Sequence, residues 1–171
     1  MFEIGDYIIY GRSGVCKVEK IGPIDSMGIT NDRIYYTLSP YYSAGSTIFT
    51  PADNKNEVMR PVISKDEALQ LIDDMKDVET IQITDEKNVE NEYKNAIRKC
   101  NCTELVKIIK TIYLRKQTRI ADGKKITSSD EKYFRMAEDS LYGELAVALG
   151  TTREDARRYV QERIEELMHV V

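Results

Sequence analysis

The 171-residue chain contains no tryptophan, only one histidine, three cysteines and four prolines. The single histidine, His169, gives little material for acid–base catalysis, which uses histidine more often than any other side chain. Cys16, Cys100 and Cys102 are an odd number in three different contexts, which favours reduced thiols over a disulfide framework. We therefore expect no catalytic residue, no metal site, no cofactor and no small-molecule substrate.

Long hydrophobic runs are also missing. The hydrophobic content of 42% is ordinary for a globular protein, but the apolar runs are only a few residues long and cannot span a bilayer. The first six residues are acidic and lack the apolar centre of a secretory signal. These absences predict a cytoplasmic protein with no membrane partner.

The net charge of −4 conceals a marked asymmetry along the chain. Residues 63–93 carry ten acidic and three basic residues, whereas residues 94–125 carry ten basic and two acidic residues. A basic block in an acidic protein is either an anion-binding face or one side of an internal electrostatic match between helices. Charge alone favours neither.

The N-terminal part, residues 1–62, has the texture of a small β domain. Six of the nine glycines and all four prolines lie here, between short stretches of alternating apolar residues. Five short strands separated by turn residues are typical of a Tudor- or SH3-like β-barrel. The predicted strands are 7–10, 15–21, 34–38, 47–50 and 58–62, with loops at 22–32 and 40–46.

The C-terminal part, residues 63–171, has a helical period and predicts an all-α domain of about five helices. A capping box of Ser64 and Glu67 begins the first helix. Further helices are predicted over about 85–99, 103–120 and 128–149 and after residue 151, and 79–85 is predicted to be an irregular linker. Expected caps are at 101–103, at Ser128 with Glu131, and at Thr151 with Glu154. The fold class is therefore α+β.

Basic side chains recur at helical spacing within the block 94–125. Lys94 and Arg98 are four residues apart, as are Arg115 and Arg119, so each pair shares a helix face. Cations at this density can follow a phosphate backbone without reading its sequence. The alternative is that they pair with the acidic helix 65–77 and with the last helix.

Several short motifs are spread along the chain. The first is Ile4-Gly5-Asp6-Tyr7-Ile8-Ile9-Tyr10 with Gly14. The others are Asn88-Val89 with Tyr93-Lys94, Leu114-Arg115, Glu131-Lys132 and Gly143-Glu144-Leu145-Ala146. With these motifs the chain resembles, over nearly its whole length, the CarD/CdnL family of bacterial transcription regulators.

The resemblance implies a Tudor-like domain that docks on the β subunit of RNA polymerase. An edge strand of that domain extends a sheet of the polymerase. The matching residues in this chain are Ser46, Thr47, Ile48, Phe49 and Thr50.

The resemblance also implies that the helical domain reaches the upstream edge of the promoter bubble. Family members insert a tryptophan wedge into the minor groove there, and the wedge position falls on Val89 in this chain. The expected DNA-contacting residues are Asn88, Val89, Lys94, Arg98, Arg115, Lys116, Arg119, Lys124 and Lys125.

Together these observations predict a non-enzymatic transcription regulator. It would bind RNA polymerase through residues 1–62 and contact promoter DNA weakly and non-specifically through residues 63–171, modulating open-complex stability. The alternative is a protein–protein adaptor that makes no DNA contact.

Overall fold

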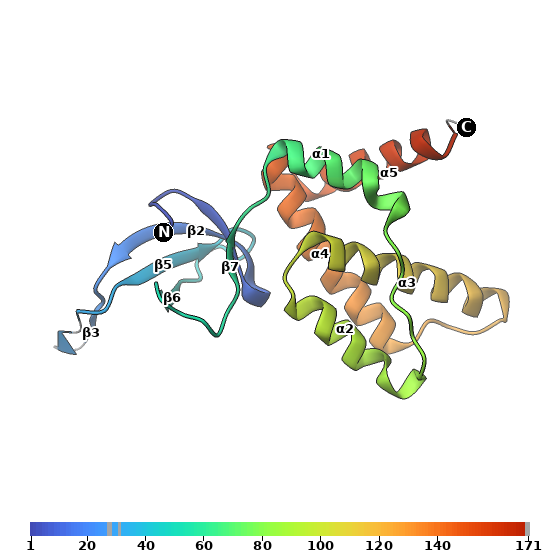
Figure 1. The fold of residues 1–171 in the computed structure, drawn as a ribbon, viewed down its shortest axis with the longest axis horizontal. Coiled ribbons are helices and arrows are strands. Elements are labelled where there is room, and N and C mark those ends of the chain that lie inside the picture. The colour runs from blue at the N-terminus through green and yellow to red at the C-terminus, as the bar shows by residue number, and fades with distance from the viewer. Residues whose placement is uncertain (27–28, 31, 170–171) are drawn as a thin grey trace. The chain divides into compact units, whose positions relative to one another are not determined.

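Five short strands form one antiparallel sheet in the N-terminal part of the chain. The structure is a computed structural model that describes residues 1–26, 29–30 and 32–169. The strand order is β6-β5-β2-β1-β7. The sheet is the blue and cyan part of the ribbon in Figure 1. The strands are β1 (Tyr7–Tyr10), β2 (Gly14–Gly22), β5 (Tyr35–Pro40), β6 (Ile48–Pro51) and β7 (Met59–Pro61).

Two further short strands lie in the segment that the sequence predicted as a hairpin loop. β3 (Asp25–Ser26) pairs with β4 (Ile29–Thr30) in a separate two-stranded sheet. Part of that predicted loop lies outside the described residues.

The turn between β1 and β2 explains the glycines of the first motif. A single turn of 3-10 helix, Gly11–Ser13, joins the strands, and Gly14 follows it with φ of 70°. A positive φ at this position favours glycine, because a Cβ atom is disfavoured there. The turn sets the register in which Ile8 pairs with Cys16, and both side chains are fully buried.

The α+β class is confirmed, but the predicted closed barrel is not. β6 and β7 are the two edge strands of the sheet, and no pairing joins them within the described residues. A barrel requires its first and last strands to pair, because closure is what removes the free edges. Five residues form the buried core of the sheet: Ile8, Cys16, Val18, Tyr36 and Leu38.

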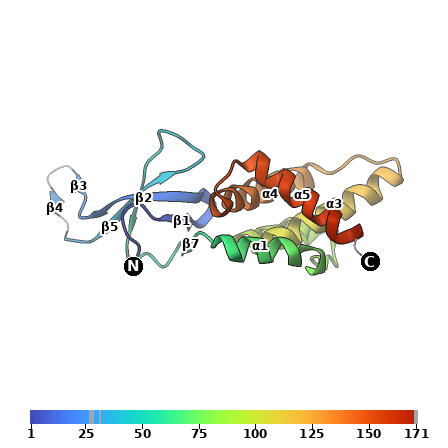
Figure 2. The ribbon, with the colours of Figure 1, turned by 90° about the horizontal axis from the view of Figure 1, so that it is seen from above.

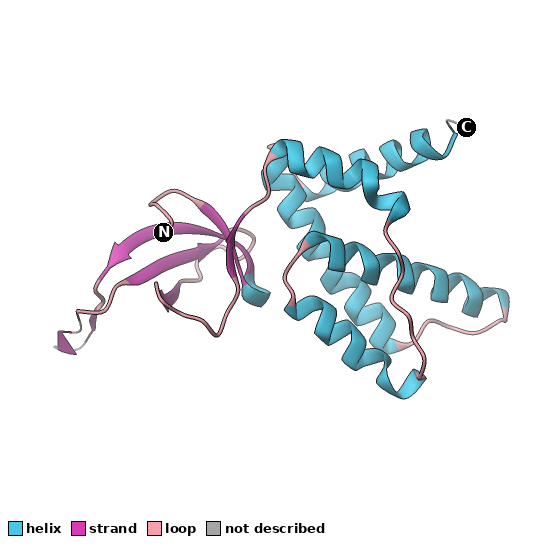
Figure 3. Ribbon diagram, in the orientation of Figure 1, coloured by secondary structure: helices cyan, strands magenta, loops and turns pink. Residues whose placement is uncertain are grey.

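Five α-helices make up the C-terminal part (Figure 3). The irregular segment expected at 79–85 is confirmed. The helices are α1 (Lys65–Asp74), α2 (Val89–Arg98), α3 (Cys102–Ala121), α4 (Ser128–Leu149) and α5 (Arg153–His169).

The helix caps confirm some of the predictions and shift others by one residue. Ser64 and Glu67 form the predicted capping box, and the side chain of Asn101 accepts the N–H of Glu104. The cap of α4 is Thr127, and not Ser128 as predicted, because the Thr127 hydroxyl accepts the Asp130 N–H.

The cap of α5 is also one residue away from its predicted position. The Thr152 hydroxyl, and not that of Thr151, accepts the N–H of Asp155 at 3.1 Å.

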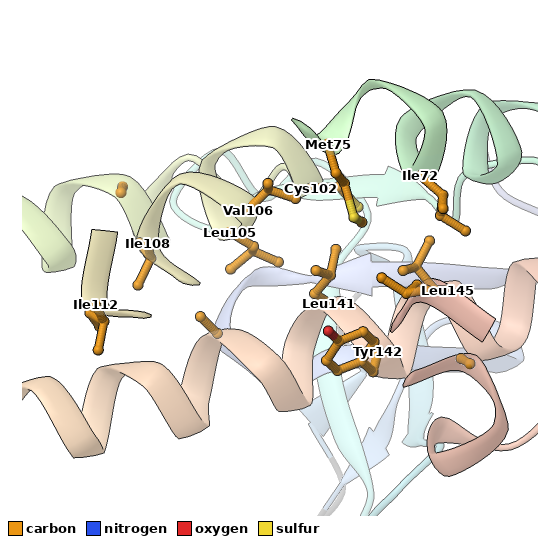
Figure 4. Close-up of a cluster of buried hydrophobic side chains, with 14 of the residues drawn as sticks. Ile72, Met75, Cys102, Leu105, Val106, Ile108, Ile112, Leu141, Tyr142 and Leu145 are labelled. Carbon is orange, nitrogen blue, oxygen red and sulfur yellow. The ribbon is translucent and has the colours of Figure 1, made fainter. Parts of the chain in front are cut away.

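The helical core forms where α3 and α4 face each other. Leu105, Val106 and Ile108 on α3 belong to one buried cluster with Leu141 and Leu145 on α4, and Leu105 lies next to Leu141 (Figure 4). Burial of such aliphatic side chains contributes about 1.5–3 kcal/mol each to folding.

Helices α1 and α5 pack together at the side of this core (Figure 2). The guanidinium of Arg163 on α5 donates to the carboxylate of Asp73 on α1 at 2.9 Å. The two helices are therefore joined by an ion pair.

The chain divides into two compact units, Met1–Val62 and Ile63–Val171. The backbone N–H of Val62 donates to the Tyr7 carbonyl at 3.2 Å, within the first unit. The next N–H, that of Ile63, donates to the buried Glu144 carboxylate at 3.0 Å, within the second unit. Two successive peptide groups are thus fixed to different units.

Candidate partner-binding surfaces

β6 provides a free strand edge in the N-terminal unit. It pairs with β5, with Thr37 opposite Phe49 and Leu38 opposite Ile48. Within the described residues no strand pairs with its other side. An unpaired strand edge is a template for a strand of another chain.

The register of this edge identifies which backbone groups point outwards. The N–H of Ala52 donates to the Ile34 carbonyl at 2.9 Å at the end of the β5–β6 ladder. Hydrogen-bonded pairs alternate along an antiparallel ladder, so Thr50 and Ile48 direct their N–H and C=O groups towards β5. Phe49, between them, directs its N–H and C=O groups to the open side.

The side chains of β6 follow the same alternation. Phe49 is 55% exposed, whereas Thr50 is buried and Ile48 is half-buried. The Thr50 hydroxyl accepts the Tyr10 hydroxyl at 3.2 Å and the Asn54 amide at 3.0 Å. These contacts fix the inner side of β6 and leave the aromatic ring of Phe49 on the surface.

The part of the β6 edge that can pair with a strand of another chain is short. Pro51 has no N–H, and its carbonyl accepts the Asn54 N–H at 3.0 Å. Ser46 and Thr47 lie in the exposed turn that precedes β6. Five residues are expected at the polymerase contact. Of these, Phe49 is the one whose backbone N–H and C=O point outwards according to the alternation of the ladder.

In the helical unit, Arg115 is held by carboxylates instead of facing solvent. Its Nε donates to Asp130 at 2.9 Å, and its two terminal nitrogens donate to Glu86 at 2.8 and 3.0 Å. Asp130 is fully buried and also accepts the Tyr93 hydroxyl at 2.8 Å. The side chain of Arg115 is only 18% exposed, so it is poorly placed to contact DNA.

This network shifts the pKa values of its members. Hydrogen bonds from Arg115 lower the pKa of Glu86. The pKa of Tyr93 is raised, first by burial and then by its hydrogen bond to Asp130. Both pKa shifts favour the protonation states that these hydrogen bonds require, which are an ionised Glu86 and a protonated Tyr93.

Other cations of the basic block also have internal partners. Lys110 donates to the carbonyls of Met75 and Lys76 at the end of the first helical segment. Lys99 and Lys107 both pair with Glu104.

Internal pairing therefore exists, and it matches the expected partners only in part, because Lys110 binds backbone carbonyls at the end of the helix 65–77. Lys94 pairs with Glu90 on its own helix at 3.8 Å. The ion pairs of Lys94, Lys99, Lys107 and Arg115 described here do not use a carboxylate of the helix 65–77 or of α5.

The residue at the expected wedge position is not on the surface. Val89 begins α2 and is 8% exposed, within the helical core. Asn88, which precedes it, is exposed. A valine in the core cannot enter a DNA groove without opening the helical unit, and this placement gives the wedge no support.

The exposed cations lie towards opposite ends of α3. Lys116, Lys124 and Lys125 are exposed on the last turns of α3 and in the turn after it, where Arg119 donates to the Lys125 carbonyl at 2.7 Å. Arg98 is exposed at the end of α2, next to the start of α3. A helix of 20 residues is about 30 Å long, so the expected residues do not form one site.

The sequence analysis did not identify a cluster of exposed tyrosines in the N-terminal unit. The rings of Tyr7 and Tyr41 meet edge to face at 5.7 Å, and those of Tyr41 and Tyr42 at 4.8 Å. The available signal was a pair of adjacent tyrosines within a predicted turn, where burial is unusual.

In the part of the chain that the structure describes, no group of three or more His, Cys, Asp or Glu side chains is arranged to hold a metal ion. No described helix combines the length and the apolar character that crossing a membrane requires.

The N-terminal unit is a small sheet with a strand edge that no other described strand pairs with and that carries an exposed aromatic ring. Such edges are typical of domains that bind other proteins. Residues 2–63 match the family model of the CarD-like/TRCF RID domain. The match confirms the CarD-like resemblance over these residues, and such a domain fits a transcription-related interaction with RNA polymerase. No curated protein was found that matches the chain.

Proposed function

We propose that the chain is a non-enzymatic transcription regulator that binds the β subunit of RNA polymerase through Ser46–Thr50. The observation that carries the proposal is the outward N–H and C=O of Phe49 on the free edge of β6. A strand of the polymerase would pair with these groups, and its side chain opposite Phe49 would pack on the exposed ring.

The other edge of the sheet is less suited to strand addition. β7 is three residues long and ends at Pro61, which lacks an N–H. The Pro61 carbonyl also accepts the Arg60 guanidinium at 3.1 Å. These features favour β6 as the docking edge.

A proline scan of the two edges tests the proposal. Phe49→Pro removes the outward N–H without removing a bond to β5, and we expect binding to core RNA polymerase to weaken about tenfold or more. Met59→Pro is the matched control, because the Val62–Tyr7 and Gly11–Val58 bonds place the Met59 N–H on the outer side of β7.

Binding is measured by biolayer interferometry, and circular dichroism reports that each variant is folded. Equal loss of affinity in the two proline variants, or no loss in Phe49→Pro, would contradict the assignment of β6.

We further propose that the helical unit contacts promoter DNA at the upstream edge of the bubble, weakly and without sequence preference. Support comes from the exposed cations at the α3–α4 end, Lys116, Lys124 and Lys125, with Arg119 beside them. Lys94 and Arg98 on α2, next to Asn88, form a second, smaller group. Such contacts supply salt-dependent affinity by counterion release.

The lifetime of the open polymerase–promoter complex tests this second step. We expect the double change Lys124→Glu and Lys125→Glu to abolish the protein's effect on that lifetime while leaving polymerase binding intact. Lys65→Glu with Lys76→Glu, the same charge change on and just after α1, should leave the effect unchanged.

An effect that survives in the Lys124/Lys125 variant would instead favour an adaptor that makes no DNA contact. The internal pairing of Arg115, Lys110 and Lys107 is the observation that keeps this alternative open.

A further inference from the structure

Three tyrosines form an exposed aromatic cluster on the sheet of the N-terminal unit. Tyr7, Tyr41 and Tyr42 are 37%, 49% and 36% exposed. Their edge-to-face contacts, with interplanar angles of 80° and 83°, hold the rings in one arrangement without burying them. Preorganised, exposed tyrosines are typical of interface hot spots, because they offer a large contact area and have little entropy to lose.

The backbone beneath the cluster is well fixed. The N–H of Tyr41 donates to the Val15 carbonyl at 2.9 Å, which extends the β2–β5 ladder by one residue into the turn. Tyr7 lies on β1 opposite Lys17. Tyr41 and Tyr42 lie in the turn after β5, and the Tyr41–Val15 hydrogen bond ties the start of that turn to β2.

The cluster and Phe49 lie on the same face of the sheet. Ile8 and Leu38 point into the core, so their alternating neighbours Tyr7 and Ser39 point to the opposite face. Tyr41 is two residues beyond Ser39 and continues that face. Phe49 alternates with core-facing neighbours on β6 and joins it.

The separation of the two features along the strand direction is one that a continuous partner segment can span, and Tyr41, which continues β5, lies one strand inside the β6 edge. Thr37, opposite Phe49, and Tyr41 are four residues apart on β5 and its extension, which corresponds to about 13 Å in an extended chain. A strand that pairs with Phe49 and continues towards the β5–β6 turn therefore reaches the level of the tyrosines after about four residues.

Charge around the cluster has no dominant sign. The cation Lys17 lies opposite Tyr7, and the anion Glu19, two residues further along β2, accepts the Ser39 hydroxyl. A strongly charged partner would meet both signs. The open ring faces instead suit C–H-rich side chains, such as those of proline or aliphatic residues.

We infer that Tyr7, Tyr41 and Tyr42 are a second docking site for the same RNA polymerase segment that adds to β6, and that they receive a neutral proline or aliphatic side chain flanking the added strand. The inference rests on the proposed docking through β6 and adds a partner chemistry and a second anchor to it.

Affinity of the full chain for core RNA polymerase tests the inference. Tyr41→Ser should weaken binding about tenfold, and Tyr41→Phe, which keeps the ring, should restore it to within about twofold. Tyr113→Ser on α3 is the matched control, since Tyr113 is 52% exposed and Tyr41 49%, and it should leave affinity unchanged. Thermal unfolding should be the same for all three, because both positions are exposed.

Two outcomes would overturn the inference. The first is wild-type affinity in Tyr41→Ser. The second is a loss that disappears when salt is raised from about 0.1 to about 0.5 M, since screening by salt identifies a charged partner group.

Phe49→Pro separates this inference from the proposal on which it rests. If Phe49→Pro loses binding and Tyr41→Ser does not, the proposed docking through the β6 edge stands and the tyrosine docking site is rejected. Loss in Tyr41→Ser alone rejects the strand edge.

Discussion

One buried carboxylate, that of Asp130, connects three helices of the helical unit. Asp130 is fully buried and accepts hydrogen bonds from Tyr93 and Arg115, while Arg115 also holds Glu86 of the segment before α2. One carboxylate thus links α2, α3 and α4. A buried charge of this kind contributes little net stability when paired, but removal of one partner is costly.

Asp130→Ala should lower the free energy of unfolding by about 3 kcal/mol, because Arg115 and Tyr93 lose their buried acceptor. Urea unfolding followed by circular dichroism measures the change. Asp139→Ala, at an exposed position on the same helix, is the control and should change stability by less than about 0.5 kcal/mol. Similar effects in the two variants would show that the network is not a structural element.

Cys16 makes the stability of the sheet depend on pH. Burial raises the pKa of its thiol from 9.0 to about 11. Because the unfolded thiol ionises first, the thiol's contribution is complete below pH 9 and is lost as the pH rises towards 11. Relative to Cys16→Val, the native protein should lose on the order of 2 kcal/mol between pH of about 8 and about 10.5 in urea unfolding. Parallel pH profiles would rule out this coupling.

At the scale of elements, local sequence signals identified where helices and strands lie but not how each one ends or pairs. The capping box at Ser64 was predictable because a single hydroxyl precedes Glu67 at the right spacing. Two caps were misplaced by one residue because hydroxyl residues adjoin there, at 127–129 and 151–152, and the pattern alone does not choose between them. Barrel closure depends on pairing between β6 and β7, which no local pattern encodes.

For the candidate surfaces, too, the sequence predicted positions along the chain but not long-range pairing. The position of the proposed docking strand came from the family resemblance, whereas the pairing of Arg115 could not be obtained in that way. Glu86 and Asp130 are 29 and 15 residues away from Arg115 in the sequence. A count of basic residues cannot distinguish a cation that is paired with such distant carboxylates from one that remains exposed.

The capping box of α1 predicts a measurable asymmetry between two serines. Ser64→Ala should cost about 1 kcal/mol, because the N–H of Glu67 loses its acceptor. Ser140→Ala, at an exposed position inside α4, should be neutral or slightly stabilising, because alanine is the better helix former. Thermal unfolding of the two variants provides the comparison. Equal effects would show that the Ser64 cap does not stabilise α1.

At the scale of the whole molecule, the two units have cores of very different size. The sheet buries five hydrophobic residues in its core cluster, whereas the helical unit buries nineteen, from Ala68 to Val160. A domain of about 60 residues buries a smaller fraction of its unfolded surface, about 60%, than a larger domain does, and its stability is correspondingly marginal. The two units should therefore differ in stability.

We expect the sheet unit to unfold at lower urea concentration than the helical unit. Hydrogen exchange measured by mass spectrometry should show faster exchange in β1, β2 and β5 than in α3 and α4 under native conditions. Circular dichroism at helix wavelengths should still report a folded helical unit after the sheet peptides have become unprotected. Simultaneous loss of protection in both units would mean that they form one cooperative system.

The junction at Val62 and Ile63 has a consequence for how the chain engages two partners. Val62 is bonded within the first unit and Ile63, the next residue, within the second, so the two units are tethered to each other through the chain. Once one unit is held on a large assembly, the tether gives the other unit an effective local concentration of about millimolar. A surface with very weak intrinsic affinity is then occupied much of the time, so a few exposed lysines suffice where an untethered domain would need a full binding site.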